Sequence, residues 1–319
     1  MKRSLFALCM VLAVGTGCEK SKSSGTPSGA PKGDEVTLLK QLPKGNMAVF
    51  GGTFSKFHEF MTGGLMDQMM GKIGMDAGAM KTWAECFGKH EVMMAGGVTG
   101  AMGNLKLTYV MKGITAAQVA ECGKQASYPT TVDPDGKFVT VEMTSNFGTQ
   151  KAGYLALAND IVMTQTVMAG ATAQTADRAM LEAVQKELAS GTAADDTALV
   201  AEMGKVDRTR AMWFVATTAG TMLADKVTKA SGWMDAGKGL SLDVRVEVAD
   251  AKLADEAEKA IPQAKEAADM LGPEVGSVIK ALRFDRSGKT LHFAIDLSSD
   301  QLKALMSKMG SMMPGMGGM

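Results

Sequence analysis

Sulfur side chains are unusually abundant in this 319-residue chain, which holds 28 methionines and four cysteines. Thioethers are soft ligands that select Cu(I) or Ag(I). Methionine is also a flexible core filler, so its general use in place of leucine is the competing interpretation. The densest methionine cluster, the candidate metal ligands, ends the chain at Met306, Met309, Met312, Met313, Met316 and Met319.

Histidines and nucleophiles form no catalytic motif in the sequence. His58 and His90 are each followed by Glu, but neither continues to the second His of a zinc-binding HExxH helix. His292 alternates with Phe293, which predicts a solvent-facing side chain, and Asp243 is expected to face solvent in the same way. We expect no catalytic residue and no cofactor. An enzyme assembled from dispersed residues is one alternative.

The chain begins MKRSLFALCMVLAVGTGCEK. Lys2 and Arg3 precede an apolar run of about ten residues, which is followed by small residues, as a secretory signal requires. A membrane-spanning helix needs roughly 20 apolar residues, so this run is too short to remain in the membrane as one. The stretch that ends at Cys18 resembles the lipobox of bacterial lipoproteins, with Gly15 where that family usually has leucine.

This resemblance implies a signal peptide over 1–17, and a diacylglyceryl thioether and palmitate-type acylation at Cys18. Three acyl chains would hold the protein stably, so the membrane is the expected partner. Glu19 is not the aspartate that retains many lipoproteins at the inner membrane, so the outer membrane facing the periplasm is the expected location. Ordinary cleavage, with Cys18 as a spare thiol, is the alternative.

With Cys9 removed and Cys18 lipidated, Cys86 and Cys122 remain in an exported, oxidising compartment. We expect them to form a disulfide that closes a loop of about 36 residues. Two buried free thiols are the alternative. The pair lacks the CxxC spacing of redox catalysts.

Composition limits the kinds of partner. Removal of the leader takes away two of 34 basic side chains against 34 acidic ones, which leaves a net charge of about −2. Nucleic-acid binding needs a basic face, so we expect no nucleic-acid partner. The sequence identifies no protein or small-molecule partner.

The pattern along the chain predicts an α+β fold with two divergent copies of an antiparallel sheet covered by helices. In one strand, Leu242, Val244 and Val246 alternate with polar residues. Helices are expected over 115–125 and over 251–271, the latter kinked or broken at Pro262. Each copy has a glycine turn before a strand, at 133–137 and 285–289. A chance likeness of common α+β units is the alternative.

The expected domain organisation follows from these elements. The segment 18–35, rich in Ser, Gly, Pro and Lys, is expected to be a flexible linker. Two modules follow, over 36–190 and 197–309, and then a Gly/Met-rich tail over 310–319. The body resembles uncharacterised exported α+β lipoproteins in its order of segments, which implies no function. Together these features predict a lipid-anchored envelope protein with a non-catalytic binding or scaffold role.

Overall fold

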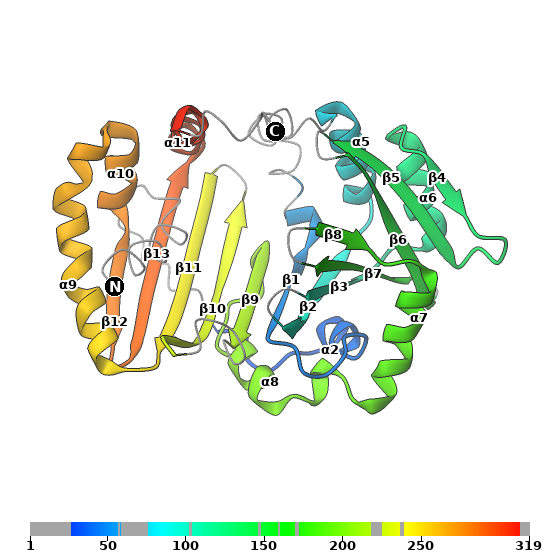
Figure 1. The fold of residues 1–319 in the computed structure, drawn as a ribbon, viewed down its shortest axis with the longest axis horizontal. Helices are drawn as coiled ribbons and strands as arrows, with labels where there is room; N and C mark the ends of the chain where they lie inside the picture. Colours follow the sequence, from blue (N-terminus) through cyan, green and yellow to red (C-terminus); the bar gives the residue numbers. More distant parts are fainter. Residues whose placement is uncertain are drawn as a thin grey trace.

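The structure is a computed structural model that describes residues 27–56, 58, 76–101, 104–145, 148–158, 160–169, 172–217, 225–236 and 239–312 (Figure 1). Cys18 and the methionines from Met313 onward lie outside these residues. None of the described helices combines the length and apolar character needed to cross a bilayer.

The fold is α+β. Thirteen antiparallel strands of the described chain form one open sheet, in the order β12-β13-β11-β10-β9-β1-β2-β3-β7-β6-β5-β4, with β8 paired to β7. The strands are β1 (Ala48–Thr53), β2 (Met93–Ala101), β3 (Asn104–Lys112), β4 (Thr130–Val132), β5 (Phe138–Ser145), β6 (Gly148–Ala158), β7 (Ile161–Ala169), β8 (Thr172–Thr175), β9 (Met212–Thr217), β10 (Val227–Ala236), β11 (Gly239–Val248), β12 (Arg283–Ser287) and β13 (Thr290–Ser298). The helices are α2 (Asp34–Leu39), α5 (Ala77–Gly88), α6 (Ala116–Gln125), α7 (Arg178–Glu187), α8 (Thr197–Met203), α9 (Ala251–Ala267), α10 (Pro273–Ala281) and α11 (Ser299–Met312).

The two halves of the sheet contain helices and strands in the same order, counted outward from the centre of the sheet. Each half starts with a helix and a central strand, α2–β1 or α8–β9, and adds two strands, β2–β3 or β10–β11. A helical segment follows, and a hairpin then returns so that its second strand, β7 or β13, pairs with the third strand. Phe50 of β1 faces Phe214 of β9 where the halves meet. The expected repeat is therefore present in the topology, but it forms one continuous sheet rather than two.

One hairpin differs from the expected match. The turn at 133–137 joins β4 to β5, whereas the turn at 285–289 lies in the β12–β13 hairpin, whose counterpart in the first half is β6–β7. The two turns have similar local chemistry, but strand pairing depends on contacts far apart in sequence. The β4–β5 hairpin thus extends the first half outward.

Helices cover the sheet on both faces. On one face, the outer face, α5 and α6 pack on the first half, and α9, α10 and α11 pack on the second (Figure 1). On the opposite, inner face, α2, α7 and α8 pack against the first half and the central strands. Helix α9 continues through Pro262 instead of breaking there.

The central strand pair depends on a glycine. Strands β1 and β9 approach so closely at Gly52 that an ideal Cβ there would overlap the carbonyl oxygen of Ala211. A residue without a side chain is required for this approach.

The body begins earlier than the expected linker boundary at residue 35. Ser28 and Gly29 donate backbone hydrogen bonds to the carbonyls of Val206 and Gly204, and Arg208 N donates to Ser28 Oγ at 2.8 Å. Arg208 Nε and Nη2 donate to the two Glu35 carboxylate oxygens at 3.0 and 3.1 Å. These bonds offset the ordering entropy of a polar segment, which composition alone does not show.

Candidate functional site

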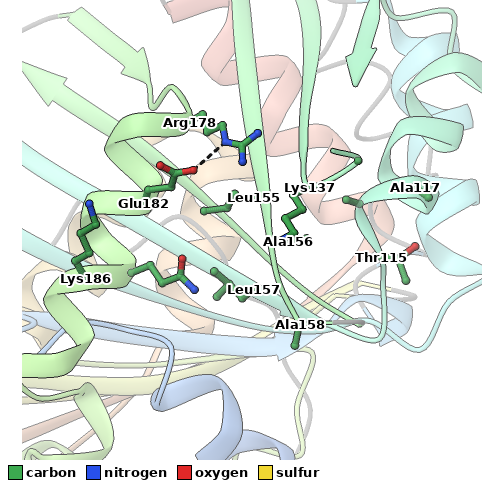
Figure 2. A pocket seen from close by; sticks show the side chains of 13 residues that line it. Thr115, Ala117, Lys137, Leu155, Ala156, Leu157, Ala158, Arg178, Glu182 and Lys186 are labelled. Atoms are coloured by element: carbon green, nitrogen blue, oxygen red, sulfur yellow. Dashed lines mark hydrogen bonds and ion pairs between the residues drawn. The ribbon is translucent and has the colours of Figure 1, made fainter. Parts of the chain in front are cut away.

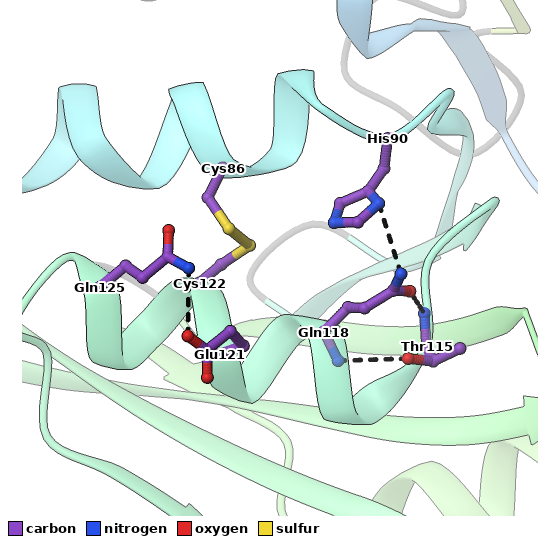
Figure 3. Close-up of a disulfide and its surroundings, with 7 residues drawn as sticks. All are labelled: Cys86, His90, Thr115, Gln118, Glu121, Cys122 and Gln125. Carbon is purple, nitrogen blue, oxygen red and sulfur yellow. Dashed lines mark hydrogen bonds between the residues drawn. A yellow bond between two sulfur atoms is a disulfide. The ribbon is translucent and has the colours of Figure 1, made fainter.

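The expected disulfide between Cys86 and Cys122 is present and joins α5 to α6 (Figure 3). Both cysteines are buried in the outer-face core of the first half. Asp76 caps α5, and a capping box of Thr115 and Gln118 begins α6. The bond therefore links two well-defined helices inside a core, which is the position of a structural cross-link.

The remaining sequence-predicted site residues are not brought together by the described structure. Cys18, Met313, Met316 and Met319 lie outside the described residues. Met306, Met309 and Met312 lie on the backbone of α11, but their side chains are not described. Within the described ranges, no three His, Cys, Asp or Glu side chains group as metal ligands.

Asp243 and His292 depart from the expected solvent exposure. Asp243 is paired across the sheet with Trp233, and its side chain is 4% exposed. His292 Nε2 lies 2.9 Å from Asp243 Oδ2, but neither atom has a hydrogen-bond partner among the described residues. Strand alternation predicts the correct face here. It does not predict that this part of the inner face is covered.

The Asp243–His292 pair does not have the neighbours of a nucleophilic site. Directly across the sheet from His292 are Arg245 on β11 and Asp285 on β12, and neither is a nucleophile of the serine or cysteine kind. The nearby Arg210 bonds Asp207 and Asp235 and lies over the ring of Trp233 at 4.2 Å. The Arg210 charge is therefore paired within the inner face, as in structural ion networks.

A groove of about 690 Å³ opens on the first half, between α7 and the start of α6 (Figure 2). Its floor is the end of β6, from Leu155 to Ala158. Residues of α7 form one wall, and the first turn of α6 with Gly136 and Lys137 forms the other. The volume lies within the 300–1,000 Å³ range of small-ligand sites.

Arg178 fixes one part of this groove. Its guanidinium donates to Glu182 Oε1 at 2.8 Å on its own helix, and to Asp133 Oδ2 at 2.9 Å and Asp135 Oδ2 at 2.6 Å on the β4–β5 turn. The hydrogen bond from Arg178, with one from the Lys137 backbone, lowers the pKa of Asp135 from 3.8 to about 2. The same contacts, led by Asp135, raise the pKa of Arg178. These bonds hold α7 to the turn and give the groove a fixed shape.

The sequence carries little signal for this groove. Its residues come from four segments between positions 115 and 186, and none of them forms a motif. The Asp133-Pro-Asp-Gly turn and Arg178 at the start of a helix are visible in the sequence. Their contact depends on how β6 places the turn beside α7.

No protein-family model matches the chain, and no curated protein does. Among solved structures, three crystal forms of the protein TP0453 align with 85% of this chain and 96–98% of theirs. Their sequence identity is 8–9% and their TM-scores are 0.45 to 0.48. A likeness of this degree carries no information about the groove or about the Asp243–His292 pair.

Proposed function

We propose that this chain is an exported, lipid-anchored protein of the bacterial envelope whose folded body binds a ligand or partner without catalysis. The observation that carries the proposal is the leader that ends at Cys18, with its basic start, apolar run and small residues. The Cys86–Cys122 disulfide supports export, because disulfides persist mainly in oxidising compartments.

Two features of the described body favour binding over chemistry. On the inner face, Arg210 is paired with Asp207 and Asp235, and neither Asp243 nor His292 has a serine or cysteine directly across the sheet. The groove beside α7, in contrast, has the size of a ligand site and a shape fixed by Arg178.

The anchor is tested by Cys18→Ser in the full chain, with Cys9→Ser as the matched control in the same leader. Cys18→Ser is expected to move the protein to the soluble fraction and to abolish incorporation of a labelled fatty acid. Cys9→Ser should leave both unchanged. A Cys18→Ser protein that stays in the membrane pellet, or that still takes up label, would show that the anchor assignment is wrong.

Soft-metal binding is the second candidate, and the observation that favours it is the cluster of six methionines that ends the chain. Titration of the full chain with Cu(I) against a competing chelator tests it. The control is a variant in which these six methionines are replaced by leucine. Equal affinity of the two proteins for Cu(I) would refute a role for the cluster.

A further inference from the structure

The groove beside α7 carries an unequal distribution of charge. Its lining residues include three cations, Lys137, Arg178 and Lys186, and one anion, Glu182. The three nearby carboxylates all bind the single guanidinium of Arg178. The acidic groups of this region are therefore already engaged.

The two lysines are left without close partners. In the part of the chain that the structure describes, neither ammonium group forms an ion pair, and Lys137 acts on Asp135 only as a longer-range charge. Lys186 extends from α7 and Lys137 from the opposite wall (Figure 2). The three carboxylates and the three cations of this region carry equal and opposite charge, so an anion would be attracted by the positions of the two lysine ammonium groups, one on either side of the groove, and not by a net charge.

The floor between these walls is apolar. It consists of Leu155, Ala156, Leu157 and Ala158 at the end of β6 (Figure 2). Leu155 is almost fully buried, whereas Leu157 is partly accessible and packs against the inner-face core. An apolar floor with a few polar groups at its margins is the usual character of a small-molecule site.

We propose that this groove binds a small organic anion with an apolar body, which lies on the β6 floor while its acidic group contacts Lys137 or Lys186. This inference deepens the proposed binding role and rests on it. It names the chemical class of the ligand. A purely polar acid would not bury apolar surface on the β6 floor. An uncharged apolar molecule would make no charge contact with the lysines.

The test uses the full chain carrying Cys18→Ser, so that no detergent is needed, and two fluorescent probes of similar shape. One is the anion 1-anilinonaphthalene-8-sulfonate and the other is the uncharged N-phenyl-1-naphthylamine. Lys137→Gln combined with Lys186→Gln removes the two cations. The matched control is Lys252→Gln with Lys259→Gln on the exposed side of α9, which changes the net charge equally.

The anionic probe is expected to bind the groove variant five- to tenfold more weakly, which is the effect of two exposed charge contacts. The α9 control should bind it as the parent does, and the uncharged probe should bind all three proteins alike. Leu157→Ala should weaken both probes. Equal binding of the anion to groove and α9 variants, or no binding to the parent, would overturn the inference. Neither result depends on whether Cys18 is lipidated, which the fractionation experiment decides separately.

Discussion

The contact between Glu35 and Arg208 should be sensitive to loss of either partner, because the Arg208 charge is buried and Glu35 is its counter-charge. The Arg208 side chain is 2% exposed, and Glu35, at 22%, is its carboxylate partner. Arg208 also donates to the carbonyl of Met203. Glu35→Gln keeps the shape but leaves a buried guanidinium without a counter-charge. Removal of one partner from a fully buried pair costs 3–5 kcal/mol, and partial exposure of Glu35 reduces this to about 2–3 kcal/mol.

Thermal and urea unfolding measure this loss. For a body of this size, we expect the melting temperature to fall by roughly 4–12 °C. Asp34→Asn is the matched control, because Asp34 lies in the same first turn of α2 but is 54% exposed where it contacts Lys112. It should cause a much smaller change. Arg208→Met together with Glu35→Gln should lose less than the two single variants added, because the buried charge is gone. A Glu35→Gln protein as stable as the Asp34→Asn control would refute the reasoning.

Three further predictions follow from single contacts. Replacement of Cys86 and Cys122 by serine should cost about 3–4 kcal/mol in urea unfolding, and reductant should then destabilise only the parent. The pKa of Asp135 is lowered to about 2 in the folded protein, so its contact with Arg178 should stabilise the fold above pH 4. This stabilisation should be lost as the pH falls toward 2. The urea midpoints of the parent and of Asp135→Asn should therefore converge in acid. A constant difference from pH 5 to pH 2 would contradict this. Gly52→Ala should cost about 1–3 kcal/mol by overpacking against β9, and an unchanged urea midpoint would show that the strands can separate there.

Local patterns predicted the elements of this fold well. The alternation from Leu242 to Val248 lies in β11, and the helix expected over 115–125 is α6 with its capping box. The disulfide followed from cysteine arithmetic, because only two cysteines remained for the body. Each of these signals lies within one segment, or needs no knowledge of pairing.

Long-range pairing accounts for what the sequence did not predict. The similar turns at 133–137 and 285–289 belong to hairpins at different places in the sheet, since pairing depends on which strand lies alongside. Asp243 is buried although it alternates with apolar residues, and its cross-strand neighbours are Trp233 and, from a strand distant in sequence, Ala294. The groove is lined by four separate segments. Arg208 and Glu35 form their ion pair although they lie 173 residues apart in the sequence. No local window contains these relations.

The early start of the folded body limits where this protein could act. Ser28 is held against the loop after α8, so ten peptide units separate it from Cys18. Fully extended, they reach at most about 36 Å, close to the ~30 Å thickness of the hydrocarbon layer itself. If Cys18 carries lipid, Ser28 would lie no more than about 36 Å from the leaflet that holds the anchor. A ligand or partner of such a body would then be met close to that membrane surface.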